Sequence, residues 1–568
     1  MRITYNDKLN KLLNPYLESL LKEKSSLEPE TLTLFDLFME DLDMGGRYGI
    51  FSEILEPRLE EIIREENIES IANLMDGRLN TLFRYMLGDE FAGLFHTYLQ
   101  LEARCPHTIG YDRRAQRSAH PSNHLDHARD AWLQFLKLRA TGFSVEAILK
   151  GGNTPEDTEE FSGYMNSSYW LAAQIAQGNE KVIEYLNQVL TSENNVHRLQ
   201  RWYLHAIAIS GHRPLLELEG KLLLAAKLQE GLRQAIVETM DEGCPESYLY
   251  LFSIIYNNGL QRFASVKRSI AVCTGIGEQD SSERITNKYV ELIWNFLNHP
   301  ETARNTLQSK DTVELYLALW SIGFYDTDEI RAIVPDIIRK GAKHQIQTLL
   351  YFLRCTQSSQ MNHLISKDAF EVWHDDPKVV AAILPLYMDG LYLSRYSDNK
   401  EAPTLSDYFE TPEEAVRHYG YLKQVYQSIS AKEVYSPYVF PWDCVVLTRS
   451  DVVLKMAYIA WMTNDIRLRE ELCTYLPALE SYNRASYIGI VLPRTESKVE
   501  QEYVLQSLGD RSADIRDEAY KVLSEMSLSP EQYQHIEELL RFKYSEMRIN
   551  AINLLMKQPE AQLAAADC

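Results

Sequence analysis

A cluster of six side chains able to bind a metal ion or act as nucleophiles can be selected between positions 105 and 127. They are Cys105, His107, His120, His124, Asp126 and His127. Thiolate, imidazole and carboxylate groups are the ligands that zinc takes from proteins. Because His124 and His127 are three residues apart, a helix would place both imidazoles on one face. The segment contains two prolines and the sequence has no H-E-x-x-H motif, so a metal-dependent enzyme is only an alternative here. We expect no cofactor.

A second candidate for chemistry is the pair His374-Asp375. Helical phosphohydrolases of the HD superfamily use such a pair in a metal site, and His363 is the upstream residue that might join it. A site of that kind needs at least four converging ligands, and the others cannot be assigned. The residues 373–377 read more simply as a turn with an acidic helix start. We therefore predict a structural role for them.

A basic island stands out against an acidic chain. Lys and Arg number 58 and Asp and Glu number 81, which gives a formal net charge of −23 at pH 7. The island comprises Arg113, Arg114, Arg117, Arg129, Lys137 and Arg139. It would suit a nucleic-acid backbone, but the net charge repels nucleic acid and anionic membranes at long range. We favour pairing of the island with the N-terminal glutamates Glu56, Glu60, Glu61, Glu65, Glu66 and Glu69.

The elements that must position these residues are indicated by a repeat of 32 residues, clear over 469–557. An arginine recurs as Arg484, Arg516 and Arg548, each followed by an apolar pair. These pairs are Ile490 with Val491, Val522 with Leu523, and Leu554 with Leu555. The first half of each unit carries apolar residues four apart, namely Leu472 with Leu476, Val504 with Leu508, and Ile536 with Leu540. Each unit is therefore predicted to be a helical hairpin, and such units stack into an α-solenoid with a continuous core.

The segment from Asp510 to Ala519 resembles the second-helix signature of HEAT-type repeats, in which an aspartate precedes an apolar-Arg pair and an alanine. In that family the repeated Asp and Arg form a ladder between neighbouring repeats. Ala478 and Phe542 stand at the aspartate position of the other two units, so the resemblance implies a partial ladder. The structural role is the main interpretation of the three arginines, because a partly buried arginine bonded to a neighbouring turn needs no ligand.

The remainder of the chain shows the same alternation of amphipathic helices and turns without a strict repeat, so we expect an all-α protein. Composition suggests five segments: an N-terminal helical region (1–150), a linker (151–165), degenerate helical repeats (166–395), an irregular connection with loops (396–450) and HEAT-like repeats (451–568). The apolar residues from Leu9 to Leu21 follow a helical period, which predicts an amphipathic helix rather than a signal peptide. Seven scattered cysteines without a C-x-x-C pair favour a reducing compartment, so we expect a cytoplasmic protein.

Three stretches are similar to the N-terminal helical region of large uncharacterised bacterial MolR-like proteins. They are residues 219–236, residues 262–268, and Gly110 to Arg114 with Arg117-Ser118. The resemblance implies that the chain is the N-terminal part of a longer protein, truncated at its C-terminus, that continues with further helical repeats. Some relatives carry a WGR module linked to nucleic acid, but no WGR tripeptide occurs here.

These observations favour a non-catalytic helical-repeat scaffold that binds a protein partner along an extended surface and has no membrane contact. The partner is unidentified, and further repeats of the same full-length chain are one candidate. The first alternative is a nucleic-acid-linked regulator that uses the island from Arg113 to Arg139. The second is a metal-dependent enzyme that uses the cluster from Cys105 to His127.

Overall fold

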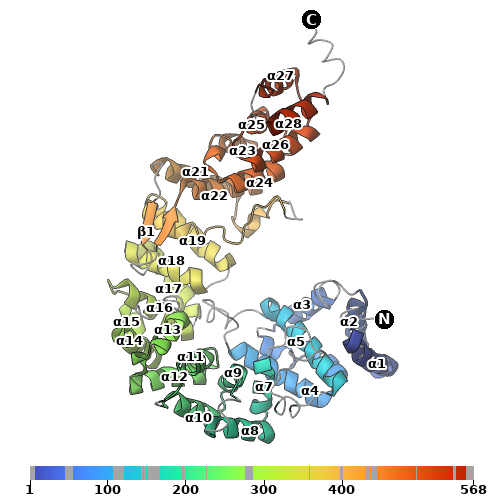
Figure 1. Ribbon diagram of the computed structural model, residues 1–568, viewed down its shortest axis with the longest axis vertical. Coiled ribbons are helices and arrows are strands. Elements are labelled where there is room, and N and C mark those ends of the chain that lie inside the picture. The colour runs from blue at the N-terminus through green and yellow to red at the C-terminus, as the bar shows by residue number, and fades with distance from the viewer. Residues whose placement is uncertain are drawn as a thin grey trace. The chain divides into compact units, whose positions relative to one another are not determined.

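The computed structural model describes residues 7–44, 55–68, 70–105, 121–142, 145, 149, 167–192, 199–225, 227–274, 286–325, 327–356, 359–396, 401–429, 434–437, 444–493, 495–541 and 545–557. These residues are almost wholly helical, with one two-stranded sheet among them (Figure 1). The predicted all-α class is confirmed. Within the described ranges, no helix has both the length and the apolar character required to cross a membrane.

The chain divides into two compact units. Unit 1 comprises residues 1–309 and 317–330, and unit 2 comprises residues 310–316 and 331–568. The helices α16 (Thr312–Tyr325) and α17 (Thr327–Lys340) each contribute residues to both units. Short 3-10 turns occur at Lys24–Ser26, Ile71–Asn73, Leu260–Arg262, Leu405–Asp407 and Leu476–Ala478.

Unit 1 begins with the predicted amphipathic helix. The helices of this unit are α1 (Asp7–Glu23), α2 (Pro29–Met44), α3 (Leu55–Glu65), α4 (Leu79–Arg104), α5 (Pro121–Thr141), α7 (Ser167–Ala176), α8 (Glu180–Thr191), α9 (Arg201–Ser210), α10 (Arg213–Leu223), α11 (Glu230–Asp241), α12 (Pro245–Asn258), α13 (Ala264–Cys273), α14 (Asn287–Asn298) and α15 (Pro300–Thr306). Leu13 and Leu17 of α1 are buried, and the hydroxyl of Tyr16 donates to the Met86 carbonyl of α4 at 2.7 Å. Burial of one apolar face thus docks α1 on the unit.

The later helices of unit 1 are arranged as stacked hairpins. The helices α7, α9, α11 and α13 contact one another in that order, and so do α8, α10, α12 and α14. Each helix therefore packs on the helix two places along the chain, as successive hairpins in a stack do. Local signals set the boundaries, since Asn179 accepts the Val182 amide at the start of α8 and Gly211 ends α9 with a positive φ of 66°.

Unit 2 contains the 32-residue repeat. Its elements are α18 (Lys343–Thr356), α19 (Ser359–Trp373), α20 (Pro377–Ile383), α21 (Pro412–Ser428), β1 (Val434–Pro437), β2 (Cys444–Leu447), α22 (Arg449–Thr463), α23 (Ile466–Leu472), α24 (Ser481–Val491), α25 (Lys498–Ser507), α26 (Ala513–Glu525), α27 (Pro530–Leu539) and α28 (Ser545–Leu555). The antiparallel strands pair Val434 with Leu447 and Pro437 with Cys444.

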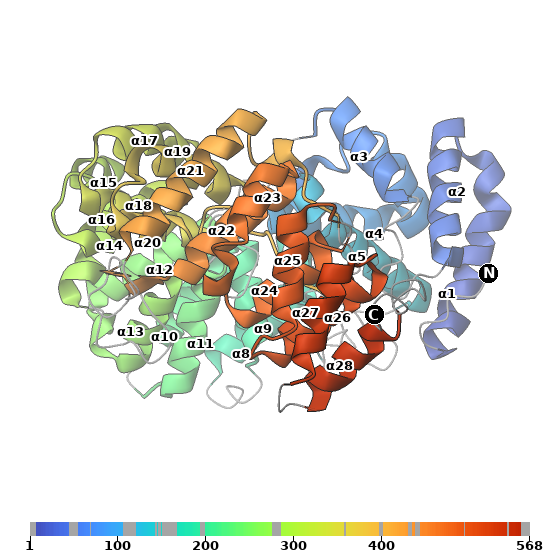
Figure 2. The same ribbon diagram turned by 90° about the horizontal axis from the view of Figure 1, so that it is seen from above.

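The three repeats form three stacked hairpins (Figures 1 and 2). The first helices α23, α25 and α27 contact one another in order, and the second helices α24, α26 and α28 do the same. Several of the apolar positions that repeat at 32 residues line this core, with Leu472, Val504 and Ile536 all fully buried. Ile490, Val491 and Leu555 are only partly buried. Leu540 departs from the pattern and is 38% exposed, because α27 ends at Leu539 and the chain turns away there.

The arginines of the repeat differ in their surroundings. Arg484 donates to Asp510 at 2.9 Å, and Arg516 donates to Glu546 at the same distance, so each bridges to the following repeat. The second bridge uses Glu546, in the first turn of α28, rather than a residue at the aspartate position. Arg548 is exposed. Of these two bridges, the one between Arg484 and Asp510 uses the aspartate position, and the HEAT resemblance itself stays a prediction.

Residues 396–450, expected to be an irregular connection, contain α21 and both strands. Thr411 accepts the Glu414 amide at the start of α21, Pro412 fits the first helical turn, and Leu422 and Val425 are buried. Good capping and an apolar stripe therefore stabilise a helix within the segment that was expected to be an irregular connection with loops.

Candidate functional site

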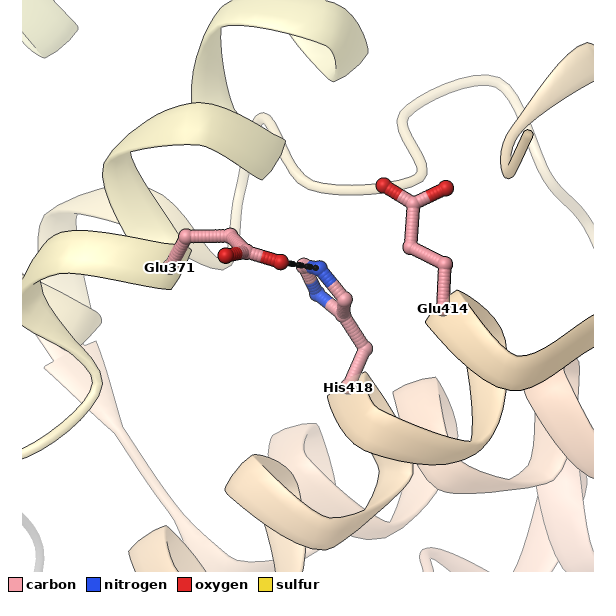
Figure 3. A group of neighbouring side chains, drawn as sticks. All are labelled: Glu371, Glu414 and His418. Carbon is pink, nitrogen blue, oxygen red and sulfur yellow. Dashed lines mark hydrogen bonds and ion pairs between the residues drawn. The ribbon is translucent and has the colours of Figure 1, made fainter. Parts of the chain in front are cut away.

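A partly buried group of three potential metal ligands joins α19 to α21 (Figure 3). Glu371 lies on α19, and Glu414 and His418 lie four residues apart on α21. One ligand atom from each residue lies within 4.8 Å of the other two, and this group is the one set of three such residues found within the described part of the chain. The spacing of four residues places the glutamate and the histidine on the same face of α21.

His418 is fully buried and uses both ring nitrogens. Its Nε2 lies 3.1 Å from Glu371 Oε1, and its Nδ1 lies 2.9 Å from the Tyr387 hydroxyl. Burial lowers the pKa of His418 to about 4, so the imidazole is neutral at pH 7. An ionised carboxylate only accepts hydrogen bonds. It follows that Nε2–H donates to Glu371 and that Nδ1 accepts from Tyr387.

Each carboxylate of the group faces a cation. Arg417 donates to Glu371 at 2.7 Å, and Lys367 lies 3.0 Å from Glu414. Burial alone would raise the pKa of both glutamates, but the hydrogen bonds from these cations leave both pKa values below the usual range. Two negative and two positive charges therefore surround a neutral histidine. The residues contain metal-type ligands, but their charges are already balanced by protein groups, so the geometry describes a structural network that ties α19 to α21.

The histidines of the proposed His-Asp site are separately engaged. His363 is buried, its Nδ1 accepts the Met388 amide at 2.9 Å, and its Nε2 lies 2.9 Å from the Tyr408 carbonyl. Burial lowers the pKa of His363 to about 4. His374 stacks on Tyr421 with ring centroids 3.9 Å apart. Asp375 is exposed. These contacts agree with the structural interpretation of residues 373–377, in which Asp376 caps α20.

The predicted cysteine–histidine cluster is described only in part. Cys105 follows α4, is buried, and directs its thiol towards the Ile209 carbonyl at 3.9 Å. His107 and His120 lie outside the described residues. The backbone of His124, Asp126 and His127 belongs to α5, but their side chains also lie outside the description.

The basic island is likewise described in part. Arg113, Arg114 and Arg117 lie outside the described residues, as does the side chain of Arg129. Lys137 is buried, whereas Arg139 is exposed and packs over the Phe91 ring. Three of the glutamates expected to face the island pair with arginines of the N-terminal region. Glu65 and Glu66 each lie 2.6 Å from Arg78, and Glu61 lies 2.6 Å from Arg58, because these residues are close in the chain.

Unit 2 also presents two exposed tyrosines on one segment. Tyr392 and Tyr396 are 67% and 73% exposed, and the ring centres of Tyr396 and of Tyr482, on α24, lie 6.5 Å apart. The Tyr482 hydroxyl lies 3.0 Å from the hydroxyls of both Tyr392 and Ser394. We call Tyr392, Tyr396 and Tyr482 the tyrosine surface. The sequence did not predict this surface, because Tyr482 lies about 90 positions after the other two tyrosines and the segment that carries those two follows no repeat.

Contacts from three helices hold the segment that carries the tyrosine surface. Tyr458 of α22 donates to the Leu391 carbonyl at 2.9 Å, and Ser486 of α24 accepts the Arg395 amide at 3.3 Å. The Arg395 guanidinium donates to Asp514 of α26 at 2.6 Å and lies 4.9 Å from the centre of the Tyr396 ring. These bonds fix the backbone beneath the exposed rings.

The fold and these surroundings define an all-α protein built from stacked helical hairpins. The chain belongs to a family of unknown function, DUF5724, which matches residues 34–566. No curated protein matches the chain. The resemblances to MolR-like proteins and to HEAT-type repeats therefore stay predictions.

Proposed function

We propose that this protein is a non-catalytic helical-repeat scaffold that binds a protein partner, with the tyrosine surface as the main contact. The observation that carries the proposal is a pair of large exposed rings on a segment held by three helices. Tyrosine is enriched among the residues that dominate binding energy at protein interfaces, because its ring buries a large area with few rotatable bonds. A rigid anchor also loses little conformational entropy on binding.

The charges beside the tyrosine surface favour a basic partner segment. Asp389 and Glu480 adjoin its tyrosines in sequence, and Asp514 is 55% exposed. Arg395 has a side-chain exposure of 8% and is already paired with Asp514. Lys455 interacts with Asp389, and burial lowers the pKa of this amine to about 8. Arginine or lysine side chains of a partner would stack on the negative faces of the rings while the acidic neighbours attract them.

Affinity capture with the tagged full-length chain tests the proposal. The chain is used against lysate of its own cells as wild type, as Tyr392→Ala/Tyr396→Ala, and as the control Ile466→Ala/Val499→Ala. The control residues are exposed apolar side chains of α23 and α25, at 50% and 47% exposure. Retained protein, nucleic acid and metal are all quantified.

We expect a stoichiometric basic protein that binds at least about tenfold more weakly to the tyrosine variant, since each hot-spot residue contributes about 2 kcal/mol or more. The control should retain it fully. Capture that is equal in both variants, or recovery of nucleic acid or metal without a protein, would contradict the proposal.

A further inference from the structure

Four basic side chains of unit 1 lie on or beside the start of α13. Arg262 ends the 3-10 turn that precedes this helix, Lys267 and Arg268 lie on the helix, and Lys227 lies between α10 and α11. Lys227 and Arg262 are exposed, and Lys267 and Arg268 are half-buried. No carboxylate of the described residues lies within ion-pair distance of any of the four. We call these four residues the basic surface of unit 1.

Contacts with its neighbours hold the Arg262 side chain in one orientation. Its guanidinium carbon lies 4.6 Å from the centre of the Phe263 ring. Its Nη1 donates to the Asn258 carbonyl at 2.7 Å and to the Gly259 carbonyl at 3.0 Å. These bonds use one of the three guanidinium nitrogens. The other two form an edge that can donate to two oxygens of a single phosphate group.

The guanidinium of Arg233, on α11, anchors the segment that carries Lys227 beside the same ring. Arg233 is 1% exposed, and its guanidinium carbon lies 3.9 Å from the centre of the Phe263 ring. It donates to the Leu223 carbonyl at 2.8 Å and to the Ala225 carbonyl at 3.4 Å. Because Lys227 follows Ala225 by two residues, its backbone is held next to the start of α13.

These contacts concentrate positive charge within an acidic chain. The carboxylate bonded within the group is Glu230, which accepts hydrogen bonds from Arg233 at 3.4 Å and from the Ser265 hydroxyl. The four cations of the basic surface and Arg233 thus accompany one carboxylate whose oxygens are already bonded, whereas the whole chain has a net charge of −23. Arg233 is buried, so solvent ions screen its positive charge less than they screen an exposed one.

We propose that the basic surface of unit 1 binds a small ligand that carries a chain of two or three phosphate groups. Phosphate oxygens accept charge-assisted hydrogen bonds from both arginine and lysine. In about 0.15 M salt, charges interact over about 8 Å, so a short ligand is attracted by the local cations. A long polyanion such as nucleic acid would also approach the acidic remainder of the chain, which repels it. The tyrosine surface belongs to unit 2, so either proposal can fail alone.

Titration calorimetry of the full-length chain with inorganic triphosphate tests the proposal, with sulfate and a single-stranded DNA oligonucleotide as comparison ligands. Lys267→Gln/Arg268→Gln should weaken the binding of triphosphate at least about tenfold, the factor that one charge-assisted hydrogen bond contributes. Arg262→Lys should also weaken it, because the ammonium group keeps the charge but lacks the planar edge. The control Arg84→Gln/Lys340→Gln changes the net charge equally at exposed positions that pair with Asp89 and Asp336, and it should leave the affinity unchanged.

Lys227→Gln separates loss of the ligand contact from loss of folding. This side chain is exposed, so the variant should unfold thermally like the wild type and still bind triphosphate more weakly. Absence of triphosphate binding overturns the proposal, as does sulfate that binds equally well or an equal loss of affinity in the control variant. An oligonucleotide that binds more tightly than triphosphate through the same residues would assign the surface to nucleic acid instead.

Discussion

Two carboxyl sites, one fully buried in unit 1 and one partly buried in unit 2, differ in charge state. Glu219 of α10 is fully buried in unit 1, and neither of its carboxylate oxygens has a hydrogen-bond partner. Burial raises the pKa of Glu219 well above the usual range. In unit 2, Glu371 and Glu414 face Arg417 and Lys367, and their pKa values are lowered. Complete burial without a partner favours the protonated form of Glu219, whereas lesser burial and a cationic partner keep Glu371 and Glu414 charged.

The difference gives the two sites opposite contributions to the dependence of stability on pH. Glu219 is protonated in the folded state, so its contribution is greatest in acid and is lost as pH rises above the unfolded pKa of a glutamate. The lowered pKa values of Glu371 and Glu414 give a contribution that is present at neutral pH and lost in acid. His418, with its pKa of about 4, acts in the same direction, because unfolding in mild acid lets it take up a proton.

Breaking the paired site should have the largest effect. Lys367→Met leaves the Glu414 carboxylate buried without its cation, with side-chain exposures of 9% for the lysine and 13% for the glutamate. We expect a loss of about 3–5 kcal/mol in the free energy of unfolding, measured by urea denaturation. The control Lys340→Met removes an exposed pair with Asp336 and should change stability by less than about 0.5 kcal/mol.

A second substitution separates loss of the pair from loss of packing. Lys367→Met/Glu414→Leu removes both charges, so most of the stability should return if the unpaired carboxylate causes the defect. A double variant as unstable as Lys367→Met would show that the lysine stem, and not the ion pair, matters.

Removing the unpaired carboxyl should stabilise the protein. Glu219→Leu replaces a buried polar group without partners by an apolar one of similar size, which should add about 1–3 kcal/mol at pH 5. The gain should be larger at pH 8. At that pH the unfolded wild-type chain releases the Glu219 proton whereas the folded protein keeps it. This difference destabilises the folded wild type by about 1.4 kcal/mol for each pH unit above the unfolded pKa, up to the folded pKa.

Thermal unfolding of the wild type and Glu219→Leu at pH 5 and pH 8 measures this difference. Glu217→Gln serves as the control, since Glu217 is an exposed neighbour on α10 that pairs with Arg213. A gain that is equal at both pH values would mean that Glu219 is not protonated in the folded state.

The sequence predicted the helical repeat well, because the signal is local and recurs. Val504 and Ile536 lie in the core at the expected spacing, and the arginines at 484 and 516 bond to the next repeat. The paired site was missed although part of its signal is also local. Glu414 and His418 are four residues apart on a capped helix, a spacing that places two ligands on one face.

The remaining contacts of these sites join residues that are far apart in sequence. His418 meets Glu371 over 47 positions, and Arg395 meets Asp514 over 119. Such pairings depend on how consecutive hairpins stack, and the spacing of apolar residues in the sequence does not predict that geometry. The unpaired state of Glu219 could not be predicted for the same reason, since it depends on which side chains the neighbouring helices present.

The repeat arginines extend the comparison to cations and should show the smallest effects. Arg484 is half-buried and its partner Asp510 is 21% exposed, so Arg484→Ala removes a charge-assisted bond between repeats. We expect a loss of about 1.5–2 kcal/mol in the free energy of unfolding. Arg548→Ala, at an exposed position of the same series, should change it by less than about 0.5 kcal/mol. Urea denaturation measures both losses. Equal losses would mean that Arg484 stabilises the protein through contacts within its own helix, whereas a larger loss for Arg484→Ala would show that the bond to Asp510 in the next repeat is responsible.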